Sequence, residues 1–187
     1  MSAAHEIKIV FAGPMGAGKT TAIRSISDSP PVMTEVANTD RSSSAKETTT
    51  VALDYGQLLL EDRTVVKLYG TPGQERFSFM WDILCRGALG IVLLIDASSP
   101  TATQDFDFYV GALRRINPDQ PFVIGVGRVP PEGDLEFEGY TQRLADQGIV
   151  APVLGVDVRN RDDVLLLVDT LLCMLEARVQ ETEDAVQ

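Results

Sequence analysis

Cysteine and histidine are scarce in this chain. Its 187 residues include two cysteines, Cys85 and Cys173, and one histidine, His5. Two cysteines so far apart match neither a metal-ligand spacing nor a disulfide framework, so we expect free, buried thiols in a reducing compartment. The lone His5 is assigned no role.

Positive charge and long apolar runs are scarce as well. Sixteen Lys and Arg residues face 27 Asp and Glu residues, and the formal net charge is −11. This balance argues against binding to nucleic acid or to an anionic membrane surface. No apolar run approaches the roughly 18 residues that a membrane-spanning helix needs. Because signal-peptide, myristoylation and prenylation features are also missing, we expect a cytoplasmic protein without a direct membrane anchor.

What the sequence has instead is an alternation of strands and helices. Short apolar runs bounded by turn residues predict six strands, at 7–13, 50–60, 64–70, 89–97, 121–127 and 151–158. Helical spacing of apolar residues predicts helices at about 18–28, 74–87, 101–116, 136–147 and 161–181. This alternation predicts an α/β fold with a six-stranded, mostly parallel sheet and helices on both of its faces.

Two connections differ from that alternation. Residues 61–64 are too few for a helix, so the strands beside them form an antiparallel hairpin, and we expect one antiparallel edge strand. The segment 28–49 is rich in Ser, Thr, Pro and charge and is long for a passive connection, which predicts a functional loop. We expect residues 1–187 to form one domain, with a core at about 6–180 and a polar tail at 181–187.

The stretch "GPMGAGKT", Gly13 to Thr20, carries the strongest motif. It has the complete Gly-x-x-x-x-Gly-Lys-Thr spacing of a phosphate-binding loop (P-loop), follows an apolar strand and opens a helix. Its glycines let successive N–H groups converge on a phosphate chain at the helix N-terminus. Lys19 is then expected to reach the terminal phosphates, and the Thr20 hydroxyl to ligate Mg²⁺. The alternative, a glycine turn between a strand and a helix, leaves the Lys-Thr pair unexplained.

The P-loop and three further motifs together resemble a known family. "GPMGAGKTT", "TTTVALDYG", "YGTPGQERF" and "FMWDILCRGALGIVLLIDAS" are similar to the motifs of small Ras-like GTPases, in register over about residues 6–180. More narrowly, the chain resembles the bacterial gliding-motility (MglA-type) family and its predicted-GTPase relatives. The most specific motif is "TPGQERF", because Pro-Gly forces a turn and the Gln after it can orient a water. The resemblance implies a single-domain P-loop NTPase.

This resemblance assigns roles to individual residues. Gly73 meets the γ-phosphate through its backbone N–H and Gln74 positions the attacking water, so these two are the expected catalytic residues. Thr50 is the first choice for a threonine that closes over the γ-phosphate and Mg²⁺, and Thr49 is the next; ordinary strand entry is the alternative. The expected nucleotide-binding residues are Gly13, Gly16, Ala17, Gly18, Lys19, Thr20, Thr21, Thr50, Arg128, Asp157 and Val158. The expected metal ligands are Thr20 and Thr50.

One departure from the family pattern concerns the metal. Gly70 stands where the family at large has an aspartate that supports Mg²⁺ through water. The bacterial relatives tolerate small or apolar residues there, so the gap is compatible with the family but weakens the metal site. Thr20 and Thr50 then carry more of the metal binding, with Asp54 and Asp96 as candidate helpers. A strand-end cap is the ordinary role for Asp96.

A second departure concerns the base. Ras-like proteins recognise guanine through an Asn/Thr-Lys-x-Asp motif, whereas Gly127-Arg128-Val129-Pro130 stands at that place here. Pro130 has no acceptor side chain. The last base-contacting turn is Asp157-Val158-Arg159, which resembles the version in the bacterial relatives. Guanine specificity therefore depends on the resemblance rather than on these residues.

Together these features predict a molecular switch that binds and slowly hydrolyses GTP to GDP with Mg²⁺ and signals through a protein partner. The resemblance implies a roadblock-type partner, acting as activator or scaffold, and a role in motility, polarity or surface signalling. Arg41, Lys46 and Arg76 can supply positive charge to the transition state, although solvated loop charge is their ordinary role. The alternatives are a pseudo-GTPase without turnover and a P-loop ATPase or kinase with a different base specificity.

Overall fold

The computed structural model describes residues 6–29, 32–36, 51–74, 79–129 and 134–184. Within them, seven strands form one sheet in the order β2-β3-β4-β1-β5-β6-β7. The strands are β1 (Glu6–Ala12), β2 (Val32–Val36), β3 (Val51–Leu59), β4 (Val65–Gly70), β5 (Gly90–Asp96), β6 (Phe122–Gly127) and β7 (Val153–Gly155). The described helices are α1 (Lys19–Ile26), α2 (Phe79–Cys85), α3 (Ala102–Ile116), α4 (Asp134–Asp146) and α5 (Arg161–Asp184).

The sheet is mostly parallel, as the sequence predicts. β1 pairs in parallel with β4 and β5, and β6 pairs in parallel with β5 and β7. β3 is antiparallel to both of its neighbours, β4 and β2, which confirms the predicted hairpin. The structure adds a seventh strand, because β2 lies inside the segment 28–49 that the sequence indicates as a loop. β2 therefore forms the edge, and the antiparallel β3 lies one place inside it.

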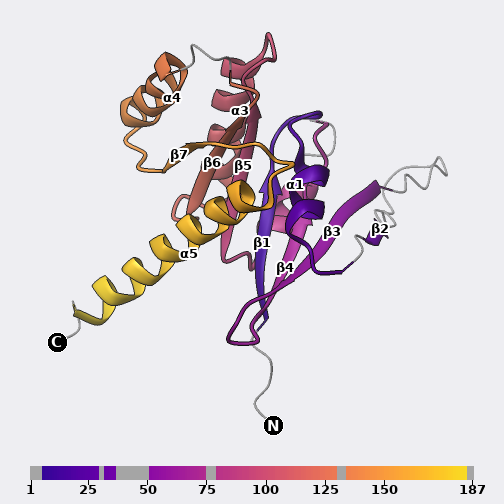
Figure 1. Ribbon diagram of the computed structural model, residues 1–187. Helices are drawn as coiled ribbons and strands as arrows, with labels where there is room; N and C mark the ends of the chain where they lie inside the picture. The colour runs from indigo at the N-terminus through magenta and orange to yellow at the C-terminus, as the bar shows by residue number, and fades with distance from the viewer. Residues whose placement is uncertain (1–5, 30–31, 37–50, 75–78, 130–133, 185–187) are drawn as a thin grey trace, which may run out of the picture.

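Helices lie on both faces of the sheet (Figure 1), and each face carries a large apolar core. Successive residues of a strand point to opposite faces, so Ile9 and Phe11 lie in one core while Val10 and Ala12 lie in the other. α1 and α5 lie side by side over the first core, and α2, α3 and α4 contribute to the second. This arrangement confirms the expected helices on both faces. No helix in the described part of the chain is long and apolar enough to cross a membrane.

The carboxyl ends of the parallel strands meet at one edge of the sheet. β1 lies in the middle, with β4 on one side and β5 on the other, and each strand is followed at this edge by a loop. Crossing connections leave such a sheet in opposite directions from its centre, which opens a crevice there. The loop after β1 is the P-loop, so the fold places this motif at the crevice.

The two cysteines differ in environment and should differ in reactivity. Cys85 is buried at the end of α2, and burial raises the pKa of its thiol to about 11. Cys173 on α5 is exposed, so the expectation of a buried thiol is wrong for this residue. Because the thiolate is the reactive form, we expect iodoacetamide at neutral pH to label Cys173 and to spare Cys85. Peptide mass spectrometry of native and urea-unfolded protein measures both sites. Equal labelling of the two cysteines in the native protein would contradict the packing of α2.

Candidate functional site

The site begins with the P-loop between β1 and α1. Gly13, Gly16 and Gly18 have φ angles of 138°, 85° and 93°, which disfavour residues with a side chain. A Cβ at Gly13 would also lie 2.2 Å from the carbonyl oxygen of Leu94 on β5. Gly18 is the N-cap of α1 and makes no side-chain cap bond. The N–H groups of the first helical turn are thus available to an anion.

Lys19, the first residue of α1, is only 7% exposed. Its Nζ donates hydrogen bonds to the carbonyl oxygens of Gly13, at 2.8 Å, and Pro14, at 2.7 Å. Burial lowers the pKa of Lys19 to about 8, while the negative charge of Asp54 acts in the opposite direction. A buried ammonium requires acceptors, and the backbone of the P-loop supplies them. The lysine is therefore held within the loop, with its charge at the edge of a cavity.

This cavity, the phosphate cavity, has a volume of about 430 Å³ and is lined by the P-loop, the start of α1, Asp54 of β3 and the residues after β4. Lys19, Thr20 and Gly73 are among its lining residues. Thr71 lines it as well, and its Oγ1 is buried without a hydrogen-bond partner among the described residues. A buried hydroxyl without a partner is unfavourable, so this oxygen indicates room for a water or a ligand atom.

The segment after β4, residues 71–74 (the Gly73 segment), lies directly on the P-loop. A Cβ built at Gly73 would be 2.5 Å from the backbone N of Met15, so only glycine fits at this approach. Gln74 follows; it is exposed, and its Nε2 lies 3.9 Å from Sδ of Met15 in the P-loop. The structure thus brings Gly73 into the lining of the cavity, whereas Gln74 is not among the residues that line it.

Two aromatic side chains hold this segment from behind. Trp81 of α2 donates a hydrogen bond from Nε1 to the carbonyl oxygen of Pro72, at 3.1 Å. Tyr109 of α3 donates from its hydroxyl to the carbonyl oxygen of Gly73, at 3.3 Å. The two rings are stacked, with centroids 4.7 Å apart. A displacement of Gly73 therefore disturbs contacts on both helices.

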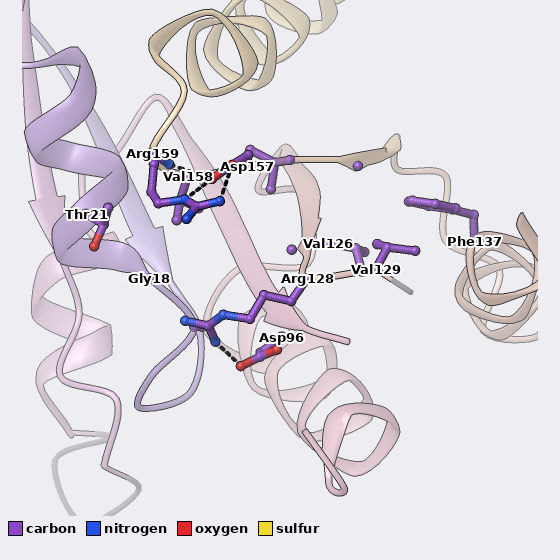
Figure 2. Close-up of a pocket in the computed structure, with 14 residues that line it drawn as sticks. Gly18, Thr21, Asp96, Val126, Arg128, Val129, Phe137, Asp157, Val158 and Arg159 are labelled. Carbon is purple, nitrogen blue, oxygen red and sulfur yellow. Dashed lines mark hydrogen bonds and ion pairs between the residues drawn. The ribbon is translucent and has the colours of Figure 1, made fainter. Parts of the chain in front are cut away.

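A second cavity, the base cavity, adjoins the first and has a volume of about 690 Å³ (Figure 2). Arg128, directly after β6, lines both cavities and has a φ of 54°, which is unusual for a residue with a side chain. Its guanidinium donates to the carbonyl oxygen of Gly16, at 3.2 Å, and to the Asp96 carboxylate. Burial alone would raise the pKa of Asp96, but hydrogen bonds from Ser98 and the charge of Arg128 lower it overall. Arg128 thus ties the β6 loop to the P-loop.

The base cavity has apolar walls and charged edges. Apolar lining comes from Ala17, Val126, Val129, Phe137, Val156 and Val158. At one edge Asp157 accepts two side-chain hydrogen bonds from Arg159, from Nε at 2.8 Å and from Nη2 at 2.7 Å. These bonds lower the pKa of Asp157 to about 2. Apolar walls with a few polar groups at the edge suit a flat, partly polar ligand such as a nucleobase.

The sequence of the chain matches an established family model. Residues 11–138 match the family described as conserved hypothetical ATP binding protein. The chain belongs to this family.

Individual relatives include small GTPases. An uncharacterized protein of Methanocaldococcus jannaschii is 30% identical over 100 residues, and this match covers 54% of the chain and 57% of that protein. The Ras-related protein RabC of Dictyostelium discoideum is 23% identical over 186 residues, 95% of the chain and 88% of RabC. The Ypt/Rab-type GTPase Rab7 of Gibberella zeae is 30% identical over 124 residues, 63% of the chain and 56% of Rab7. The chain thus spans a little over half the length of the first and third of these relatives.

Most of the site residues that the sequence predicts lie together in the structure of this family member. The phosphate cavity is lined by Gly16, Gly18, Lys19, Thr20, Thr21, Gly73 and Arg128. The base cavity is lined by Ala17, Gly18, Thr21, Arg128, Asp157 and Val158. Gly13 contributes a carbonyl oxygen to Lys19. The remaining expectations lie outside the described residues: Thr50 and Thr49, the loop charges Arg41, Lys46 and Arg76, and Pro130.

The sequence gives little sign of three other residues at the site. Thr71 lies within the "TPGQERF" motif, but its unpaired hydroxyl appears only in the structure. Trp81 stands on an apolar helical stripe, which indicates burial but not its bond to Pro72. Tyr109 is 36 residues away from Gly73, so no local pattern could link the two. Long-range hydrogen bonds of this kind leave no periodic trace in a sequence.

The close approach of Gly73 to the P-loop predicts a specific effect of Gly73→Ala. Its Cβ would meet backbone atoms of Met15 and Pro14, so the segment must move away and the Trp81 bond to Pro72 must lengthen. We expect a loss of about 1–3 kcal/mol in the free energy of unfolding. We also expect a red shift in the emission of Trp81, which is the single tryptophan of the chain.

Gly111→Ala on α3 is the matched control. A Cβ at Gly111 meets nothing within 4 Å, so this variant should be neutral or more stable by about 0.5–1 kcal/mol, with unchanged emission. Urea unfolding and fluorescence spectra measure both quantities. Identical spectra and stability for Gly73→Ala and the wild type would show that the segment does not lie on the P-loop.

Proposed function

We propose that the protein is a nucleotide-dependent switch that binds GTP and GDP with Mg²⁺, hydrolyses GTP slowly and signals through a protein partner. The observation that carries this proposal is the contact between the Gly73 segment and the P-loop beside Lys19. A site that only holds a nucleotide needs no such contact. The Rab-type GTPases among the relatives support the same class of function.

The switching step follows from the lack of free space at Gly73. No Cβ fits between Gly73 and Met15, so a terminal phosphate that enters at this point changes the position of the segment. The bonds from Trp81 and Tyr109 then pass the change to α2 and α3. Loss of the γ-phosphate on hydrolysis removes the group that holds the altered position. Nucleotide-dependent ordering of loops is a common switching mode.

The residues of the phosphate cavity also fit a magnesium ion. Mg²⁺ in nucleotide sites binds few protein groups, keeps several waters and uses substrate phosphates. The Thr20 hydroxyl would be a direct ligand, and the buried, unpaired Thr71 hydroxyl fits a metal-bound water. Thr50 remains a proposed second ligand. When bound, the ion would offset negative charge on the phosphates.

The surface of α2, beside the Gly73 segment, fits a protein partner. α2 exposes Phe79 and Ile83, which are 48% and 65% accessible and lie one helical turn apart. A partner that packs on these side chains would detect a change in the neighbouring Gly73 segment. We place this partner in the roadblock class, as activator or scaffold, and propose an MglA-like role in motility, polarity or surface signalling in the cytoplasm. These finer assignments derive from the sequence resemblance.

An adenine nucleotide is the second candidate ligand. The family is described as ATP binding, and Pro130 replaces the aspartate that reads guanine in Ras-like proteins. Titration of purified protein with fluorescent mant-GDP and mant-ADP, with and without Mg²⁺, tests both candidates. We expect tighter binding of mant-GDP. Stronger binding of mant-ADP would replace GTP with ATP in the proposal, and binding of neither nucleotide would overturn the switch.

Lys19→Ala tests the phosphate site within the same titration. Removal of the ammonium leaves the phosphate charge without its cationic partner, so nucleotide binding should be lost or weakened by at least about tenfold. Lys67→Ala is the control, because Lys67 forms an ion pair with Glu6 away from both cavities. Lys67→Ala should bind as the wild type does. Unchanged affinity of Lys19→Ala would show that the nucleotide binds elsewhere.

Gln74→Leu tests turnover separately from binding. The Gln74 side chain is exposed and is proposed to orient water only in the transition state, so the variant should keep its GTP affinity and lose hydrolysis. Single-turnover assays should give a wild-type rate on the order of 10⁻⁴ to 10⁻² per second without a partner. Gln104→Leu, on the exposed side of α3, is the control. Equal rates for Gln74→Leu and the wild type would exclude this role, and a wild type without turnover would indicate a pseudo-GTPase.

A further inference from the structure

The missing side chain at Gly70 is matched by a carboxylate on the neighbouring strand. Tyr55 pairs with Tyr69 across the antiparallel β3–β4 ladder, so the preceding residue Asp54 lies beside the following residue Gly70. A Cβ built at Gly70 would lie 2.9 Å from Asp54 Cβ and 3.1 Å from Asp54 Oδ2. Directly opposed residues in a ladder normally keep their Cβ atoms about 4.5–5.5 Å apart. The carboxylate of Asp54 therefore leans over Gly70 into space that a side chain on β4 would fill.

From this position Asp54 reaches the start of α1. Its Oδ2 accepts a hydrogen bond from Thr20 Oγ1 at 2.5 Å, although the two residues are 34 positions apart. A hydroxyl has one proton and two lone pairs, so donation to Asp54 leaves the lone pairs of Thr20 free for a cation. Asp54 also lines the phosphate cavity, and its charge raises the pKa of Lys19 against the effect of burial. The Asp54 carboxylate thus lines the same cavity as Lys19 and Thr20, the two P-loop side chains that we expect to bind the phosphates and the metal.

We propose that Asp54 is the carboxylate that supports Mg²⁺ in this protein, by orienting the Thr20 hydroxyl and holding metal-bound water from β3 in place of a residue at position 70. This inference rests on the proposed nucleotide function. The negative charge lies on β3 rather than on β4, and glycine suits position 70 because a side chain there would collide with Asp54. Mutation of a side chain that orients a metal ligand through a hydrogen bond commonly lowers metal affinity by about 10–100-fold.

Asp96, the other candidate helper of the metal, is not among the residues that line the phosphate cavity. Its carboxylate accepts hydrogen bonds from Ser98 and from Arg128, and it lines the base cavity rather than the phosphate cavity. No cluster of three or more metal-binding side chains occurs among the residues that the structure describes. From the described residues, the proposed magnesium site therefore draws on Thr20 and one carboxylate, and the nucleotide phosphates and the proposed ligand Thr50 would complete it.

The test follows release of mant-GDP, or of mant-ADP if that nucleotide binds more tightly, across a Mg²⁺ titration. Asp54→Asn keeps the shape of the side chain and an acceptor for Thr20 but removes the charge. We expect the variant to retain the nucleotide through Lys19 and to need about 10–100-fold more Mg²⁺ to slow its release. Asp54→Gly/Gly70→Asp returns the carboxylate to β4 and should restore the wild-type response. Asp169→Asn, an exposed site on α5, is the control for net charge.

A second readout is the affinity of Mn²⁺ for the protein–nucleotide complex, measured by electron paramagnetic resonance. It should fall in Asp54→Asn, recover in the double variant and stay unchanged in Asp169→Asn. Equal Mg²⁺ dependence of Asp54→Asn and the wild type would overturn the role of Asp54 while leaving the nucleotide switch intact. If wild-type protein binds neither mant-nucleotide, the proposed function fails first and the metal role fails with it.

Discussion

The buried ammonium of Lys19 constrains the whole site. A charge that is 7% exposed at the end of the central strand must be surrounded by oxygen atoms, and the carbonyl groups of Gly13 and Pro14 supply them. The loop can fold around it only because Gly13 accepts a positive φ and approaches Leu94 closely. The same fold directs the first N–H groups of α1 outward. The phosphate binding that we propose would thus follow from how the chain accommodates one charge.

The segment after β4 depends on that loop and connects it to the opposite face of the sheet. Gly73 lies on the P-loop backbone, while Trp81 and Tyr109 bind the carbonyl groups beside it from α2 and α3. Both aromatic side chains are almost completely buried, so their rings cannot follow a displaced segment without changes in packing. A movement of the Gly73 segment therefore requires the packing of α2 and α3 to change with it. This property suits a switch better than a simple nucleotide carrier.

The sequence predicts the local features of the molecule and misses those that depend on distant contacts. The strand and helix on either side of the P-loop, the hairpin at 61–64 and the helices on both faces follow from spacing and turn chemistry, and the structure confirms these elements. β2 was not predictable, because its five residues lie in a polar segment and pair only with β3. The unpaired Thr71 hydroxyl and the Tyr109 contact likewise depend on tertiary packing. From the sequence, Gly70 lacks the aspartate of the family pattern and both Asp54 and Asp96 are candidate helpers of the metal, but only the β3–β4 register shows that Asp54 lies beside Gly70.

When a motif position lacks its expected side chain, there are two physical explanations. Either the function of that side chain is lost, or a side chain on another strand supplies the same chemical group. The two explanations differ in what surrounds that position. At Gly70 the space is filled by the Asp54 carboxylate, which already accepts a hydrogen bond from Thr20. At the place of the guanine motif, Arg128 donates a hydrogen bond to the carbonyl oxygen of Gly16 in the P-loop. The described contacts thus preserve the connection between the phosphate and base cavities, and they leave base preference to the edges of the base cavity, where Asp157 and Arg159 lie.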